Sequence, residues 1–266
     1  MMILPINNRD NFIKSFLNPI SRLSPTCTLT VQDSPASTHD GDGYQMSGKP
    51  DAVTEEISTV VHNNSNIFLK ASYRMKRGSI EGCTLCLPDT IKLIKILSCL
   101  EEESFNLEYK ENCITYNNGK GSKFKYHLFD DSLALKSPFD FDRIKQIQKW
   151  SSFTLTREKN NSILKALPFV TENSKAYLTN EEEKVSIELT DKKLQNVDSY
   201  TALVGEDFIG DSIPGELILD VELFRLISTL NYEECKVYIN NEFKMLKLDI
   251  VIDDCNLTFV STSFKN

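Results

Sequence analysis

The fold of this chain is decided by the stretch Leu93-Ile-Lys-Ile-Leu-Ser-Cys-Leu100 and its continuation Glu101-Glu-Glu-Ser-Phe-Asn-Leu-Glu-Tyr109. The same pattern returns 130 positions later as Leu223-Phe-Arg-Leu-Ile-Ser-Thr-Leu230, continued by Asn231-Tyr-Glu-Glu-Cys-Lys-Val-Tyr-Ile239. In each copy apolar residues first recur at helical spacing and then alternate as in a strand. The repeat predicts an internal duplication, in which a short amphipathic helix leads into a strand in each half.

A second pair of helices is predicted near the start of each half. Residues 8–18 and 157–167 both carry apolar residues at helical spacing, and Pro19 and Pro168 are expected to end these helices. This pair is offset by about 150 positions, about 20 more than the first pair. A stretch of loop composition at 33–56 has about that length. One insertion in the first half therefore reconciles both offsets.

The remaining segments predict an α+β protein whose strands follow one another at meander spacing. Strands are expected at 26–32, 57–62, 67–75, 82–87, 105–109, 113–116, 123–129, 153–156, 176–179, 184–189, 197–204, 215–219, 235–239, 245–252 and 257–261. Asp89 occupies the position of a helix N-cap. Residues 132–151 fit neither period and predict a connector, with a helical turn at 142–149.

The composition is that of an ordered globular protein. The chain has 266 residues, of which 40% are apolar and 26% charged, enough for one large domain or two of ordinary size. No apolar run approaches the length needed to cross a membrane, so no membrane partner is expected. The N-terminal residues do not resemble a secretory signal, and the seven cysteines are scattered. We therefore expect reduced thiols and a cytoplasmic location.

The motifs of catalysis are missing from the sequence. The three histidines are dispersed, and there is no glycine-rich phosphate loop, HExxH or GxSxG motif. Cys83 and Cys86 have CxxC spacing but lie in a predicted strand, where residues three apart point to opposite faces. Asp40-Gly-Asp-Gly43 lacks the later ligands of a calcium loop. We expect no metal, no cofactor and no enzymatic activity.

The predicted helices carry a net positive charge, whereas the rest of the chain is acidic. The net charge is −8, but the four predicted helices carry eight positive and five negative residues, leaving −11 for the remainder. Positive residues on a solvent-exposed helical face are common in any protein. They also suit sequence-independent contact with a phosphate backbone. Both interpretations remain open on charge alone.

Four stretches resemble the DNA sliding clamps, and among them the clamp of T-even-type bacteriophages. They are Asn11–Leu17, Leu87–Leu97, Lys193–Asp207 and Leu246–Val260. The resemblance implies two tandem clamp-type domains, 1–136 and 152–266, joined by a connector at 137–151, with helices on one face of antiparallel sheets. It further implies a homotrimer that closes as a pseudo-sixfold ring around duplex DNA and tethers a DNA polymerase, in this case a viral one. The insertion at 33–56 departs from the pattern.

The resemblance also implies three sets of site residues and a clamp loader as a further partner. The residues expected to face DNA are Arg9, Lys14, Lys92, Lys95, Lys159, Lys165 and Arg225. Edge strands of neighbouring subunits would pair through Phe124, Tyr126 and Leu128 on one side and Tyr200, Ala202 and Val204 on the other. A pocket for partner peptides is expected under the connector, at Ile144, Ile147, Met245 and Val260.

Two other hypotheses remain. The chain could be a clamp-fold accessory factor for transcription or repair that docks proteins without encircling DNA. It could also be an unrelated α+β enzyme whose site has no recognisable motif. The oligomeric state would discriminate between the clamp and the enzyme.

Overall fold

The computed structural model describes residues 2–33, 54–64, 66–76, 82–133, 139–169, 171, 174–194 and 197–264. The chain forms two compact units. Unit 1 comprises Met1–Val60, Ala71–Lys136 and Asp253–Cys255, and unit 2 comprises Val61–Lys70, Ser137–Ile252 and Asn256–Asn266.

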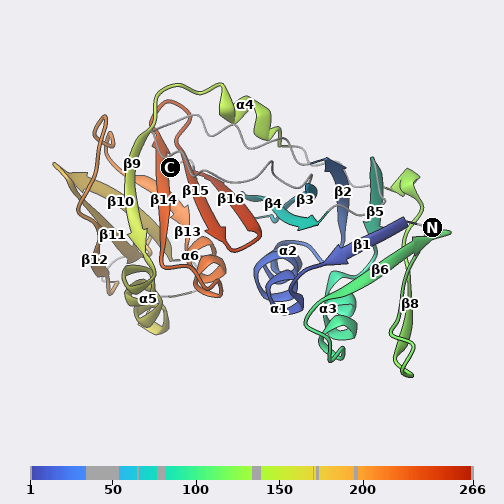
Figure 1. The fold of residues 1–266 in the computed structure, drawn as a ribbon. Helices are drawn as coiled ribbons and strands as arrows, with labels where there is room; N and C mark the ends of the chain where they lie inside the picture. Colours follow the sequence, from blue (N-terminus) through green and yellow to red (C-terminus); the bar gives the residue numbers. More distant parts are fainter. Residues whose placement is uncertain are drawn as a thin grey trace, which may run out of the picture. The chain divides into compact units, whose positions relative to one another are not determined.

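Unit 1 packs short helical segments against antiparallel strands. Its elements are β1 (Met2–Ile6), α1 (Arg9–Asn11), the π-helix η1 (Phe12–Leu17), α2 (Asn18–Leu23), β2 (Cys27–Asp33), β3 (Thr54–His62), β4 (Ile67–Lys76), β5 (Cys83–Leu87), α3 (Thr90–Ser98), β6 (Phe105–Lys110), β7 (Cys113–Asn117), β8 (Lys123–His127) and the 3-10 turn η2 (Asp131–Leu133). The strands are ordered β1-β6-β7-β8 and β5-β2-β3-β4. The tip of the β3–β4 hairpin, residues 61–70, belongs to unit 2. Helices α2 and α3 lie side by side on one side of the strands (Figure 1).

Unit 2 repeats this topology. Its elements are α4 (Phe141–Lys145), β9 (Ser151–Thr156), α5 (Arg157–Ala166), the 3-10 turn η3 (Leu167–Phe169), β10 (Lys175–Glu181), β11 (Lys184–Thr190), β12 (Tyr200–Gly205), β13 (Leu217–Asp220), α6 (Val221–Ser228), β14 (Glu234–Asn240), β15 (Met245–Ile252) and β16 (Cys255–Thr262). The strands are ordered β9-β14-β15-β16 and β13-β10-β11-β12, matching those of unit 1 position by position. Helices α5 and α6 pack on each other, as α2 and α3 do (Figure 1). The predicted duplication is confirmed.

The sequence separation between corresponding strands of the two halves decreases between β2 and β3. Strands β2 and β10 begin at Cys27 and Lys175, 148 residues apart, whereas β3 and β11 begin at Thr54 and Lys184, 130 residues apart. The extra residues of the first half therefore lie between β2 and β3. Residues 34–53, including the Asp40–Gly43 run, lie outside the described residues.

Both units contain an equivalent backbone hydrogen bond between the start of the first helix and the loop after the second helix. The backbone N–H of Arg9 donates to the carbonyl oxygen of Glu103 at 2.7 Å, and that of Arg157 donates to Glu233 at 2.8 Å. In each unit this bond ties the first helix to the loop after the second helix. The bond therefore helps to fix the position of the first helix relative to the second.

In the N-terminal region one prediction was wrong and one strand was missed. Pro19 does not end the first helix, which continues as α2 to Leu23. Pro19 lies in the first turn of α2, just after the π-helix, where the missing N–H of proline is not required. Strand β1 was not predicted, because Pro5 interrupts its short apolar run. The proline is tolerated because β1 is the first strand of its sheet and pairs with β6 alone among the described strands.

Several boundaries also differ from the predictions. Strand β3 begins at Thr54, inside the stretch of loop composition. The connector helix is α4, which Asp140 caps by accepting the N–H of Asp142 and which ends before Gln146. Strand β12 begins at Tyr200 rather than at residue 197. Periodicity located these elements but not the caps and turns that bound them.

The core of unit 1 fixes the position of α3. Asp89 caps this helix as predicted, and its carboxylate accepts the N–H of Lys92 at 2.8 Å. The hydroxyl of Tyr126, on β8, donates to the carbonyl oxygen of Asp89 at 2.7 Å and accepts its N–H at 3.1 Å. Leu93 and Leu97 bury the other face of the helix. These contacts leave the lysines of α3 facing solvent.

Candidate nucleic-acid and partner-binding surfaces

The exposed face of α3 carries two cations without a carboxylate partner. Lys92 and Lys95 are exposed, and neither makes an ion pair with any described residue. They lie one helical turn apart, on the side away from the buried Leu93 and Leu97. Unpaired ammonium groups on a rigid helix can donate hydrogen bonds to phosphate oxygens without first breaking an internal salt bridge.

The two cations of the first helix are both engaged by Asp10. Lys14 contacts its carboxylate at 2.8 Å and Arg9 at 3.0 Å. The hydrogen bonds from Lys14 and then Arg9 hold the pKa of Asp10 below its usual value. The guanidinium of Arg9 also donates to the carbonyl oxygen of Leu100, beyond the end of α3. Arg9 is therefore part of the packing between the helices, whereas Lys14 remains largely exposed.

Unit 2 presents one free cation and two paired ones at the predicted positions. Lys159 contacts Glu206 at 2.7 Å, and this hydrogen bond lowers the pKa of Glu206. Arg225 contacts Glu222 at 3.4 Å, three residues earlier on α6. Lys165 is exposed and makes no ion pair with the described residues. The predicted basic face is thus divided into free and neutralised positions.

The exposed cation Arg22 was not predicted to belong to the helix layer. Arg22 lies in the last turn of α2 and is exposed. The sequence reasoning missed it because the helix was expected to end at Pro19. The apolar residues Ile20 and Leu23, both buried, carry the helical spacing past the proline and were the available signal.

The two predicted interface strands lie at sheet ends. Among the described strands, β8 ends the order β1-β6-β7-β8 and β12 ends the order β13-β10-β11-β12. Phe124, Leu128 and Ala202 are half-buried and Tyr200 is exposed, whereas Tyr126 and Val204 are buried in their own unit. Leu203 was not predicted but is 39% exposed on β12. Each strand therefore has backbone and apolar side chains available to a further strand.

An apolar pocket lies beneath the connector in unit 2. It has a volume of about 550 Å³ and is lined by Phe139, Asp140, Arg143, Ile144, Ile147, Phe243, Met245 and Thr262. Ile144, Ile147 and Met245 were predicted to lie here. Val260 was predicted too, but it is fully buried and does not line the pocket.

Aromatic rings support the wall of this pocket. The ring of Phe139 stacks on that of Phe68 with centroids 4.3 Å apart, and Phe68 stacks in turn on His62 at 5.8 Å. Phe141 packs edge-on against Phe139 at 5.1 Å. The tip of the β3–β4 hairpin thus holds the start of the connector in place.

No catalytic or metal-binding constellation is found in the described part of the chain. No group of three His, Cys, Asp or Glu side chains there could hold a metal ion. Cys83 and Cys86 are buried in β5, and none of the seven cysteines, all of which lie in the described residues, forms a disulfide. Burial raises the pKa of Cys27 and of Cys235 to about 12, which keeps these thiols protonated at neutral pH. No described helix is long and apolar enough to span a membrane.

Comparison with known proteins identifies the fold. No protein-family model and no curated protein matches the sequence. The structure matches that of PCNA from A. fulgidus, solved with the C-terminal region of FEN-1, with a TM-score of 0.72 at 11% identity over 100% of this chain and 99% of that chain. The fold is that of the DNA sliding clamps.

Two further structures agree with this assignment. Proliferating Cellular Nuclear Antigen from Entamoeba histolytica matches with a TM-score of 0.70 at 12% identity, over 99% of both chains. The DnaN sliding clamp of Pseudomonas aeruginosa matches with a TM-score of 0.70 at 11% identity, over 99% of this chain and 65% of that chain. The predicted fold class, with helices on one side of antiparallel sheets in two tandem units, is confirmed.

Proposed function

We propose that the protein is a sliding clamp, which encircles duplex DNA and tethers a DNA polymerase for processive synthesis. The observation that carries the proposal is the set of free cations Lys92, Lys95 and Lys165 on the helices of a clamp fold whose net charge is −8. Free ammonium groups attract phosphates without reading base sequence. The acidic remainder disfavours DNA elsewhere on the surface. Such an arrangement holds a duplex and lets it slide.

The proposed assembly is a homotrimer of six clamp units. The chain matches two PCNA chains over nearly their full lengths, which supports a two-unit subunit of the same kind. In the trimer β8 of one subunit would pair with β12 of the next, satisfying the backbone groups of both edges. Lys123 and Lys125 are exposed on β8, and Asp198 is exposed just before β12. The opposite charges favour this head-to-tail contact over pairing of like edges.

The proposed docking site for the polymerase is the apolar pocket beneath the connector. PCNA from A. fulgidus was solved with the C-terminal region of FEN-1, which supports a short terminal peptide as the kind of ligand. A clamp loader is a further proposed partner, because a closed ring must open to admit DNA. The resemblance to T-even-type clamps favours a viral polymerase and action in the host cytoplasm.

Retention on DNA tests the proposal. The protein is loaded on a nicked circular duplex and on the same duplex linearised, with and without bulky end blocks. A clamp stays on the circle and on the blocked duplex and slides off the free ends. Lys92→Glu, Lys95→Glu and Lys165→Glu, combined, should abolish retention, whereas Lys236→Glu on the outer side of β14 should leave it intact. Equal retention on all three DNAs would refute encirclement.

One observation favours the alternative of a docking factor that does not encircle DNA. Four of the seven predicted DNA-facing cations, Arg9, Lys14, Lys159 and Arg225, contact carboxylates. Ion pairs of this kind reduce the positive charge available to phosphates. A docking factor would bind partner peptides in the connector pocket yet fail the retention assay.

A further inference from the structure

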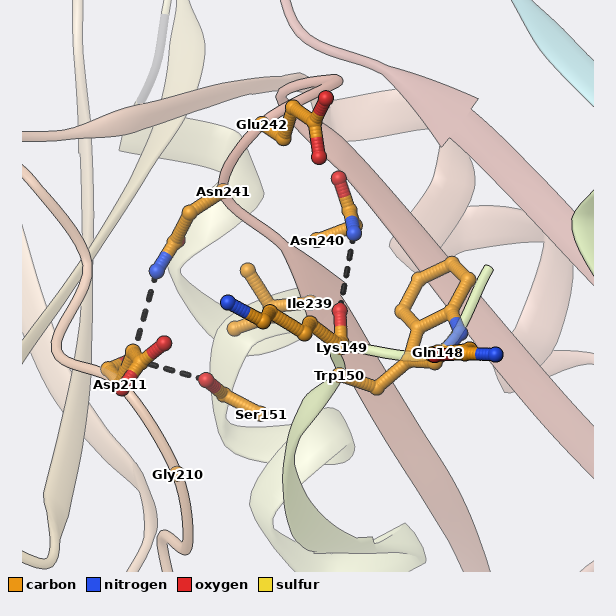
Figure 2. A pocket seen from close by; sticks show the side chains of 10 residues that line it. All are labelled: Gln148, Lys149, Trp150, Ser151, Gly210, Asp211, Ile239, Asn240, Asn241 and Glu242. Carbon is orange, nitrogen blue, oxygen red and sulfur yellow. Dashed lines mark hydrogen bonds between the residues drawn. The ribbon is translucent and has the colours of Figure 1, made fainter. Parts of the chain in front are cut away.

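A second cleft lies next to the connector pocket, within unit 2. It also has a volume of about 550 Å³, and Figure 2 shows its lining of Gln148, Lys149, Trp150, Ser151, Gly210, Asp211, Ile239, Asn240, Asn241 and Glu242. The two cavities are adjacent along both elements that line them. Ile147 lines the pocket and Gln148 the cleft, while Phe243 lines the pocket and Glu242 the cleft. A peptide that follows the connector therefore passes from one cavity into the other.

The cleft is held in shape by a close contact between one loop and the start of β9. Gly210 has φ +114°, and a Cβ at this position would lie 2.7 Å from Oγ and 2.8 Å from Cα of Ser151. The hydroxyl of Ser151 donates to the carbonyl oxygen of Asp211 at 2.8 Å. The N–H of Ile209 donates to Ser152 at 2.9 Å, and that of Ser152 to Ile209 at 2.8 Å. The loop is thereby fixed before any ligand arrives.

Two asparagines fix the opposite wall, on the β14–β15 turn. Nδ2 of Asn241 donates to the carbonyl oxygens of Asp211 at 3.3 Å and Ser212 at 3.0 Å. Nδ2 of Asn240 donates to the carbonyl oxygen of Lys149 at 2.8 Å. Because both amides are hydrogen-bonded to backbone carbonyls, the charged side chains of the lining are the groups available to contact a ligand.

The charge and the exposed side chains of the cleft indicate the chemistry of that ligand. Asp211 and Glu242 are exposed carboxylates that make no ion pair with the described residues, and Lys149 is the one cation among the lining residues. The lining thus has a formal charge of −1. Ile209, next to the cleft, is 69% exposed. A segment that carries lysine or arginine beside an apolar residue complements this surface.

We propose that the cleft binds a basic segment next to the apolar anchor of the same partner peptide, with a lysine or arginine of that segment between Asp211 and Glu242. The inference rests on the proposed docking of a peptide in the connector pocket. It adds a specificity element: partners with a basic flank bind more tightly than partners with a neutral or acidic flank. Asp211 and Glu242 thus form a subsite that selects for positive charge, next to the apolar connector pocket.

The test uses fluorescein-labelled synthetic peptides with a common Leu-Phe anchor. The flank is Lys-Lys, Gln-Gln or Glu-Glu, placed on either side of the anchor, and binding to the full chain is measured by fluorescence anisotropy. On one side, the Lys-Lys flank should improve affinity roughly three- to tenfold over Gln-Gln, as two partly exposed ion pairs allow. That gain should disappear in Asp211→Asn/Glu242→Gln. It should persist in Glu181→Gln/Glu183→Gln, which removes the same charge from exposed positions outside the cleft.

The outcomes separate this inference from the proposed function. The proposed role of the cleft is refuted if anchor peptides bind with equal affinity whatever their flank. It is also refuted if the gain in affinity from the Lys-Lys flank persists in Asp211→Asn/Glu242→Gln. Neither result contradicts peptide binding in the connector pocket. An equal loss of the gain in both double variants shows a general effect of net charge and also overturns the cleft. Failure of every anchor peptide to bind refutes the docking pocket and the cleft together.

Discussion

Replacing Tyr126 by phenylalanine tests whether this residue of β8 stabilises its own unit or forms a contact between subunits. The resemblance to sliding clamps implied a subunit contact at Tyr126, but its side chain is 3% exposed and its hydroxyl bonds both backbone groups of Asp89. Burial raises the pKa of Tyr126 to about 12, so the hydroxyl stays protonated at neutral pH. In Tyr126→Phe the ring packing is kept and two hydrogen bonds at the start of α3 are lost.

The magnitude follows from those two bonds. A net contribution of about 0.5–1.5 kcal/mol for each hydrogen bond gives a loss of roughly 1–3 kcal/mol in the free energy of unfolding. Urea unfolding at fixed protein concentration measures this loss, because assembly makes stability concentration-dependent. Hydrogen exchange of the amides of Asp89 and Lys92 should accelerate, since the bond to Lys92 depends on the position of Asp89. The oligomeric state, measured by light scattering, should not change.

Tyr200→Phe on β12 is the matched control. Its side chain is 37% exposed and its hydroxyl makes no hydrogen bond recorded among the described residues. Its stability should change by less than about 0.5 kcal/mol. The reasoning fails if Tyr126→Phe is equally neutral. It also fails if Tyr126→Phe dissociates the assembly while the unfolding energy of each subunit is preserved, because the hydroxyl would then act between subunits.

Three further predictions address the proposed surfaces. Glu206→Gln frees Lys159 from its 2.7 Å ion pair, so DNA binding should tighten and the slope of log K against log salt should steepen by about 0.9, measured by anisotropy titrations. Phe68→Ala removes the ring stacked on Phe139 and should weaken anchor-peptide binding by roughly three- to tenfold with DNA retention unchanged, in keeping with about 0.5–1.5 kcal/mol for an aromatic pair. Leu203→Glu places an unpaired charge on the exposed edge of β12 and should convert the assembly to monomers by light scattering, unless that edge lies outside the interface.

The duplication could be predicted because both halves keep the same periodic pattern in α3 and α6. The change of offset between the helix pairs also located the insertion, and the strands β2 and β3 bracket it. The path after Leu17 was not predicted, because a proline inside a helical pattern usually ends the helix, and this expectation outweighed the apolar spacing that Ile20 and Leu23 continue.

The surfaces were predictable only in part, for a different reason. Ile144 and Ile147 are apolar residues within the helical turn predicted for the connector, whereas Phe243 lies in a turn whose position in space the sequence does not reveal. Exposure of the helix cations follows from their face of the helix. Their ion pairs follow only in part. The pairs of Lys14 with Asp10 and of Arg225 with Glu222 have local helical spacing, whereas Lys159 contacts Glu206 from 47 positions away.

The two halves keep one scaffold but differ in the charge that they present. Arg9 and Arg157 make the same backbone bond to the loop after the second helix, so the helix pairs are built alike. Yet α3 offers two free lysines, whereas the cation at the matching position of α6, Arg225, is held by Glu222. In the proposed trimer the pseudo-sixfold backbone would therefore carry free charge with threefold periodicity. Because phosphate attraction scales with free cations, Lys95→Gln should reduce the salt slope of DNA binding more than Arg225→Gln at the matching position. Equal slopes would show that Arg225 leaves Glu222 when DNA is bound.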